Sequence, residues 1–275
     1  MSLSFASIAS GSNGNCYYVG NATDAVLIDA GISCRQIEVR MNKIGLQMQK
    51  VRAVFVSHEH TDHICGLPVL ARKWNLPVYV THQTLNSSGL QSQLNNTKTF
   101  RCSVPVNLGE LEITPFYKSH DAADPHSFVV SCGGIRVGIF TDIGNPCDKL
   151  MMHFSQCHAA FLEANYDENM LNNGSYPYYL KARIRSDKGH LSNMQALELF
   201  KSYRSVNLSH LILGHLSGNN NTPQIVEQLF NEHAKQTNII VASRHEQSEL
   251  YDLQVSASLQ PKRTSPLLQQ MQFAF

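Results

Sequence analysis

The chain has 275 residues, of which 43% are hydrophobic and 16% charged, and its 22 basic and 21 acidic residues leave a formal net charge of +1. This size and composition allow one large domain or two small ones, and the near-neutral charge excludes a global basic field for capturing nucleic acid. The seven cysteines form no C-x-x-C pair. Neither a signal peptide nor a membrane-spanning run of about 18 apolar residues is visible, so we expect a cytoplasmic protein with free thiols and no membrane contact.

Short apolar runs separated by turns fill the first half of the chain, a pattern that predicts β-strands. The predicted strands are Leu3–Ile8, Cys16–Val19, Val26–Ile28, Ala53–Val56 and Pro77–Val80. Apolar residues recur at helical spacing from Cys34 to Lys43, and a second helix is predicted from Ile64 to Trp74.

The second half combines further strands with helical patterns. The predicted strands are Leu111–Phe116, Ser127–Ser131, Ile135–Phe140, Ala159–Glu163, Leu211–Gly214, 238–242 and 249–253. One helix is predicted over Ser192–Ser202, where an S-x-x-Q capping box marks its start. Another is predicted from Pro223 to about Lys235, with a threonine cap before the proline.

Groups of strands with helices between them predict an α/β fold in which two packed sheets carry helices on their outer faces. No internal repeat or linker divides the chain. We therefore expect a single domain over residues 1–255, followed by a C-terminal tail over residues 256–275.

A cluster of histidines follows the apolar run in "VFVSHEHTDHICG" (Val54–Gly66). Its spacing is His58-x-His60-x-Asp62-His63, on a loop that a strand would hold in place. His58 and His60 can converge on one ion, whereas Asp62 and His63 point to a second. Imidazole and carboxylate without thiolate suit Zn²⁺ or Mn²⁺ and leave room for water. A histidine-rich polar turn is the alternative.

"SHEHTDH" resembles the H-x-H-x-D-H signature of the metallo-β-lactamase superfamily, and isolated residues after apolar runs match the family's other positions in order. The resemblance implies a four-layer αββα sandwich of two mixed sheets and two divalent ions, zinc or manganese. It assigns His58, His60 and His120 to the first ion, Asp62, His63 and His215 to the second, and Asp142 to both. Asp29, in "LIDAG", would support the ligands from behind. His126 lies close enough to His120 in the chain to face the site as well.

Two further motifs, "LEANYD" with Glu163 and "KGHLSN" with His190, resemble those of transfer-RNA 3′-processing (RNase Z-like) phosphodiesterases. There, a glutamate orients a histidine that protonates the leaving alkoxide. The implied catalytic residues are thus Glu163 and His190, together with Asp62. Alternatively, Glu163 is an ordinary strand-end residue and His190 a neighbour of a helix cap.

The segment "KARIRSDKGH" places four cations directly before His190, namely Lys181, Arg183, Arg185 and Lys188. Such a group suits contacts with the phosphates of nucleic acid. A solvated helix face with alternating charge explains the pattern equally well.

The turn "SGSNGNC" (Ser10–Cys16) and the motif "HLSGNNN" (His215–Asn221) are similar to the single-domain YycJ (WalJ)-type nuclease branch of the superfamily. One departure is Ser127, where that pattern has glycine. The resemblance implies a nuclease that digests DNA from 5′ to 3′ with a metal-bridging hydroxide as nucleophile and a histidine as general acid. The turn itself is either a hairpin or a cradle of backbone N–H groups for a phosphate.

Two other functions stay open on the residues alone. The same site suits a small cyclic or nucleotide phosphodiester, or another metallo-hydrolase substrate such as a thioester. A non-catalytic metal-binding scaffold is also possible, although the intact ligand set argues against it. The pattern does not choose between zinc and manganese, between DNA and RNA, or among oligomeric states.

Overall fold

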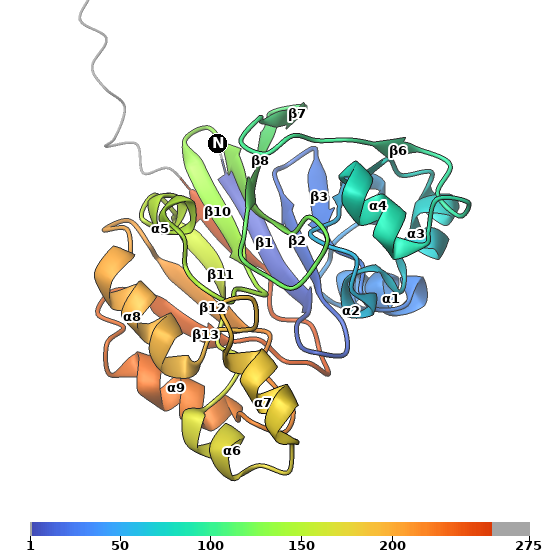
Figure 1. Cartoon of the computed structure of the whole chain (residues 1–275). Coiled ribbons are helices and arrows are strands. Elements are labelled where there is room, and N and C mark those ends of the chain that lie inside the picture. Colours follow the sequence, from blue (N-terminus) through green and yellow to red (C-terminus); the bar gives the residue numbers. More distant parts are fainter. Residues whose placement is uncertain (1, 255–275) are drawn as a thin grey trace, which may run out of the picture.

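Two seven-stranded sheets pack face to face in the computed structural model, which describes residues 2–254 (Figure 1). The first sheet contains β1 (Ser2–Ala9), β2 (Cys16–Gly20), β3 (Ala25–Ile28), β4 (Val51–Phe55), β5 (Val78–Tyr79), β6 (Thr97–Lys98) and β14 (Tyr251–Gln254). The second contains β7 (Val106–Leu108), β8 (Leu111–Tyr117), β9 (His126–Cys132), β10 (Ile135–Phe140), β11 (Ala159–Glu163), β12 (His210–Gly214) and β13 (Asn238–Val241).

Each sheet is antiparallel in one half and parallel in the other. The strand orders are β14-β1-β2-β3-β4-β5-β6 and β13-β12-β11-β10-β9-β8-β7. In the first sheet, β3 to β6 are parallel to one another, and in the second, β10 to β13 are. The carboxyl ends of neighbouring parallel strands lie at one edge, which is where ligand-binding residues gather in α/β proteins.

Helices cover the outer face of each sheet (Figure 1). Over the first sheet lie α1 (Cys34–Lys43), the 3₁₀-helix η1 (Met48–Lys50), α2 (Thr61–Ile64), α3 (Leu67–Trp74) and α4 (His82–Ser88). Over the second lie α5 (Asp148–Phe154), α8 (Asn193–Tyr203) and α9 (Pro223–Asn231), while α6 (Glu168–Asn173) and α7 (Tyr178–Arg185) form a separate pair with a small core of their own.

The alternation of side chains along each strand accounts for the layers. In β4, Phe55 contributes to the core between the sheets, whereas Val54 packs toward the helices of the first sheet. In β11, Phe161 faces the other sheet and Leu162 faces outward. Because both faces of the central strands are apolar, the sequence forms the four-layer αββα sandwich that it predicts.

Two predicted helices differ from those observed. The helix predicted over Ile64–Trp74 is divided at Gly66 into α2 and α3, because the backbone of Gly66 packs against the loop that follows β3. Its N–H donates to the carbonyl of Ala30 at 2.8 Å, and a Cβ there would lie 1.9 Å from the carbonyl oxygen of Ile32. The helix predicted to reach about Lys235 ends at Asn231.

Other expectations match the structure. Ser192 and Gln195 form the predicted capping box of α8, and all seven cysteines are free thiols. Within residues 2–254, none of the helices combines the length and apolarity needed to cross a membrane. The predicted tail over residues 256–275 lies outside the described residues, and the single-domain boundary stays a prediction.

Gly31 provides a test of how tightly the histidine loop is packed. A Cβ at this position would lie 1.7 Å from the carbonyl oxygen of Asp62. We expect Gly31→Ala to lower the free energy of unfolding by about 1–3 kcal/mol, the usual result of over-packing an interior, and to reduce metal uptake. Urea denaturation and metal analysis measure both.

The control is Gly45→Ala, where a methyl group meets nothing within 4 Å but the positive φ of 75° is strained. It should destabilise the protein by about 1 kcal/mol and leave metal uptake unchanged. Equal metal uptake in both variants would contradict the role given to Gly31.

Candidate metal centre

Three of the predicted site residues occupy strained backbone positions at strand ends. Asp29, Asp142 and His215 follow β3, β10 and β12, with φ angles of 62°, 56° and 55°. Non-glycine residues rarely adopt this left-handed conformation, and it persists where the surrounding structure enforces it, often at functional sites. Beyond the turns, Asp29 and Asp142 both contact His63, and His215 contacts Asp62.

The structure brings all seven predicted ligands together. Among the described residues, four groups of side chains have potential ligand atoms within 4.8 Å of one another: His58, His60 and His120; Asp62, His63 and His215; His58, His63 and Asp142; and Asp142, Glu163, His190 and His215. The first two groups are the two sets that the sequence assigns to separate ions.

Asp142 lies between these two sets. Its Oδ2 is 3.2 Å from Nε2 of His63, and its Oδ1 is 3.4 Å from Nε2 of His215. The same Oδ1 is 3.8 Å from Nε2 of His120, in the other set. A carboxylate in this position can contact ions on both sides.

Orphaned polar atoms indicate that the site fits a cation. Nε2 of His120, Oδ2 of Asp142 and Nε2 of His215 are buried and have no hydrogen-bond partner among the described residues. Buried polar atoms are almost always paired, so three unpaired ones aimed at a common space point to a missing positive partner. Imidazoles and carboxylates without thiolate are the donors that zinc and manganese accept, and the residues therefore fit divalent metal ions.

Asp29 holds the histidine loop from behind, as the resemblance implies. The buried carboxylate accepts hydrogen bonds from the backbone N–H and the hydroxyl of Ser57, at 2.7 and 2.8 Å. Its Oδ2 is also 2.7 Å from Nδ1 of His63. The contact leaves Nε2 of His63 as the atom that faces the cluster, which fixes the ring for metal binding.

Asn15, to which the sequence analysis gave no role, is part of the centre. Its side-chain amide is 3.1 Å from both Oδ2 of Asp62 and Nε2 of His63. The N–H groups of Gly11, Gly14 and Asn15 bond within the protein, so these three do not form a phosphate cradle. Asn15 thus contacts two members of the second predicted ligand set, and only the resemblance motif "SGSNGNC" marked the turn beforehand.

Glu163 connects two functional histidines through one carboxylate. Its Oε1 lies 2.8 Å from Nδ1 of His190 and 2.8 Å from Nδ1 of His215. Its Oε2 accepts hydrogen bonds from the backbone N–H groups of Ile143 and Leu191. The predicted contact with His190 is thus present, and the contact with the predicted ligand His215 is one that the sequence analysis missed.

Burial and charge set the protonation of the cluster. Burial lowers the pKa of His58 well below its usual value and that of His120 to about 4, so both rings are neutral. Burial acts in the same direction on His63 and His215, but nearby carboxylates outweigh it and raise the pKa of His215 to about 10. The pKa of Asp142 is lowered well below its usual range by His215 and His63 despite burial. A cation that binds His63 and His215 therefore displaces protons.

Lys118 is a buried cation beside the cluster that the sequence analysis passed over. Its ammonium group is 1% exposed and donates to the carbonyl of Thr141 at 2.8 Å. It also lies 3.7 Å from Oδ2 of Asp142. Lys118 directly follows β8, and its partner Thr141 lies 23 residues further along the chain, so no local pattern marks the position.

A cleft of about 260 Å³ opens over the cluster, lined by Asp62, Asp142, His190 and Arg183 among others. The ring of His190 is the general-acid candidate, and 19% of its side chain is exposed to this space. The cleft thus joins the potential metal ligands, the candidate acid and one cation in a single open site.

Of the four predicted phosphate contacts, only Arg183 lines the cleft. Lys181 donates a hydrogen bond to a backbone carbonyl of α6, and Arg185 forms an ion pair with Glu168, which also lies in α6. Lys188 is exposed and does not line the cleft. Lys181 and Arg185 therefore connect α7 to α6, whereas Arg183 faces the cleft.

His126 does not join the metal cluster. It begins β9 and packs edge-on against Phe100, with ring centroids 5.1 Å apart. It lines a separate cavity of about 400 Å³. Ser127, the departure from the resemblance pattern, fits into the regular pairing of β9 with β8.

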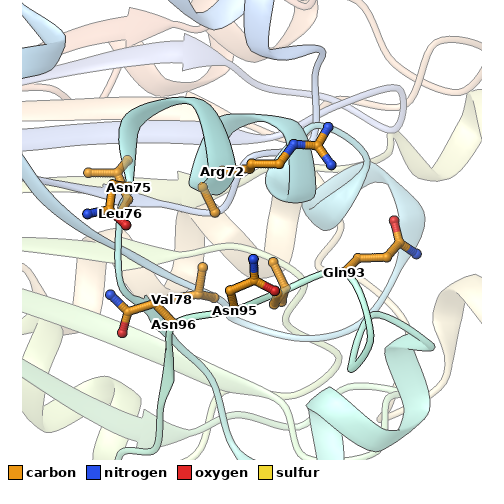
Figure 2. A pocket seen from close by; sticks show the side chains of 9 residues that line it. Arg72, Asn75, Leu76, Val78, Gln93, Asn95 and Asn96 are labelled. Carbon is orange, nitrogen blue, oxygen red and sulfur yellow. The ribbon is translucent and has the colours of Figure 1, made fainter.

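A smaller cavity of about 80 Å³ lies between α3 and the segment that leads into β6 (Figure 2). Figure 2 shows that Arg72, Gln93, Asn95 and Asn96 surround it. None of its lining residues belongs to the predicted site. Among the described residues, the histidine and carboxylate groups that could hold a metal ion lie elsewhere.

Comparisons with known proteins agree with this geometry. A family model described as a beta-lactamase superfamily domain matches residues 24–216. The chain is 35% identical over 230 residues to a Bacillus anthracis protein named exodeoxyribonuclease YycJ, which covers 82% of this chain and 86% of the relative. It is 32% identical over 223 residues to exodeoxyribonuclease WalJ of Streptococcus pneumoniae, covering 79% and 83%. The metallo-beta-lactamase fold protein YhfI from Bacillus subtilis has a similar fold, with a TM-score of 0.71 at 15% identity over 92% of this chain and 100% of that chain.

Asp29→Asn tests the support of the histidine loop. The amide keeps the shape but removes the charge that orients His63, so we expect metal affinity to fall about 10- to 100-fold. Competition with a chromophoric chelator measures the affinity. Asp148→Asn, at an exposed position of α5, serves as the control and should bind metal as the wild type does; equal affinity in both variants would rule out the proposed support.

Proposed function

Since the chain belongs to the metallo-β-lactamase superfamily, we propose that it is a metal-dependent exonuclease that hydrolyses DNA from 5′ to 3′. The observation that carries the proposal is the pair of contacts by which Glu163 holds both His190 and the potential ligand His215, each at 2.8 Å. With His190 as the proton donor, this arrangement would put it beside the proposed metal ligands. The names of the YycJ and WalJ relatives support DNA as the substrate.

The proposed metal ligands are those that the resemblance assigns. His58, His60 and His120 would hold one divalent ion, Asp62, His63 and His215 would hold another, and Asp142 would contact both. Two divalent cations at such a site lower the pKa of water to give a nucleophile and neutralise the charge of the phosphate. Zinc and manganese both suit the donors.

His190 is proposed as the general acid. Because its Nδ1 bonds to Glu163, Nε2 is the atom left to face a leaving group in the cleft. His190 and His215 outweigh the effect of burial and lower the pKa of Glu163 to about 2, so the carboxylate stays ionised and can accept a hydrogen bond from Nδ1 of His190. An alkoxide leaving group needs such a donor, and a positioned histidine typically accelerates its departure about 10²–10⁴-fold.

Asp62 is proposed to contribute to catalysis as well as to binding. The amide of Asn15 fixes its Oδ2 at 3.1 Å, and 24% of the side chain is exposed to the cleft. A carboxylate held in this way can accept a hydrogen bond from an attacking water and orient it toward the phosphorus atom.

Of the other two functions, the non-catalytic scaffold fits the site less well. A non-catalytic scaffold has no use for an oriented histidine beside its metal ligands. Hydrolysis of a small phosphodiester would use the same metals and the same general acid, so only substrate tests distinguish this activity from a nuclease. Turnover of a small phosphodiester without any cleavage of DNA would favour it.

Asp142→Ala should abolish metal-dependent release of nucleotides, because it removes the one carboxylate placed between the two ligand sets. We would follow a linear DNA labelled at its 3′ end, which 5′-to-3′ digestion shortens progressively, and covalently closed circular DNA, which an exonuclease leaves intact. Asp148→Ala is the exposed control. Cleavage of the circle, or full activity of the Asp142 variant, would be incompatible with the proposal.

His190→Ala separates the general acid from the metals. On DNA we expect kcat to fall about 10²–10⁴-fold. On methyl p-nitrophenyl phosphate the loss should be below tenfold, since p-nitrophenolate leaves without a proton. His82→Ala, at an exposed position of α4, controls for loss of an imidazole. Equal losses on both substrates would instead indicate damage to the metal site.

A further inference from the structure

The helix α7 forms one wall of the catalytic cleft. Leu180, Arg183 and Ile184 line the cleft, together with Tyr176 just before the helix. Figure 1 shows α6 and α7 as a helical pair beyond the ends of the sheets, beside the edge where the functional strand ends meet. A substrate bound in the cleft therefore lies next to this helix.

Two large aromatic side chains at the start of α7 are exposed. Tyr178 and Tyr179 are 86% and 75% exposed, more than any other tyrosine or phenylalanine among the described residues. Neither contributes to the core of the α6–α7 pair, which contains Tyr166, Leu171 and Ile184. Folding therefore gives no reason for two neighbouring tyrosine rings in solvent next to an active-site wall.

Helix geometry separates the two tyrosines. With 3.6 residues per turn, Tyr179 lies about 40° around the helix from Arg183, one turn away on the same side, whereas Tyr178 lies about 140° away. Leu180, Arg183 and Ile184 all line the cleft. From the middle of the helix face that they form, Tyr179 lies about 90° around the helix, at the margin of that face, and Tyr178 about 170°, on the reverse face. The adjacent positions thus differ in their access to a bound substrate.

Arg183 is fixed next to this margin. Its Nε donates to Oδ2 of Asp121 at 2.5 Å, which ties α7 to the segment that carries His120. The side chain is 54% exposed, and its Nη groups have no hydrogen-bond partner among the residues described. The helix carries three cations and no acid over Tyr178–Arg185, so a phosphate is the group that the free donors suit.

We propose that Tyr179 is a stacking platform for an unpaired nucleobase next to the scissile phosphate, with Arg183 on a neighbouring phosphate. This inference rests on the proposed nuclease function and adds the form of the substrate. A base can place its face on a tyrosine ring only when it is not stacked within a duplex, so the substrate is a single-stranded or frayed end. An aromatic face accepts every base, which suits an enzyme that removes successive nucleotides.

The test compares three variants with the wild type: Tyr179→Ala, Tyr179→Phe and Tyr178→Ala. Each is assayed on a single-stranded oligodeoxynucleotide and on methyl p-nitrophenyl phosphate, which has no nucleobase. We expect Tyr179→Ala to lower kcat/KM on the oligonucleotide about tenfold or more and to leave the small substrate within about twofold. Tyr179→Phe keeps the ring and should keep the activity. Tyr178→Ala is the matched control and should resemble the wild type.

The outcomes distinguish a failure of this inference from a failure of the proposed nuclease function. If the wild type digests DNA and Tyr179→Ala does so equally well, or if both alanine variants lose the same activity, the stacking platform is wrong and the nuclease stands. A loss by Tyr179→Ala on the small substrate as well would mean that the residue supports the fold of the site, which also overturns the platform. If the wild type turns over the small phosphodiester but no DNA, the proposed function fails.

Discussion

The carboxylate of Asp142 is the constraint around which the centre is arranged. It is buried between two sets of imidazoles, with Nε2 of His63 at 3.2 Å and Nε2 of His215 at 3.4 Å. A buried charge is stable only when it is paired, so protons, the ammonium group of Lys118 or bound cations must balance it. The concentration of negative charge that makes the site costly to bury is also what gives it affinity for divalent ions.

The fold places this charge where backbone strain can be tolerated. Asp29, Asp142 and His215 follow strands in left-handed conformations, which two packed sheets and their hydrogen bonds hold in place. The parallel halves of both sheets end at the same edge, so loops far apart in the chain converge there. A less rigid scaffold would relax these turns and separate the ligands.

Glu163 links the chemistry of the centre to its electrostatics. One oxygen contacts both His190 and His215, and the other is fixed by backbone N–H groups. The orientation of the proposed acid is therefore coupled to that of a proposed metal ligand. In the same way, Arg183 joins the wall of the cleft to the His120 segment through Asp121.

The sequence by itself determined the fold class and proposed the members of the cluster, because apolar runs indicate the strands and the resemblance of the H-x-H-x-D-H motif and the later residues to the superfamily implies the ligands in order. Strand existence and ligand order are local properties of the chain. Tertiary structure alone decided which groups share partners: the contact of Glu163 with His215, the reach of Asn15 to Asp62 and the selection of Arg183 from four cations. It also divided the predicted helix at Gly66, since the close approach of another backbone leaves no periodic signal. These outcomes depend on distances between segments tens of residues apart, and a local pattern carries no information about such distances.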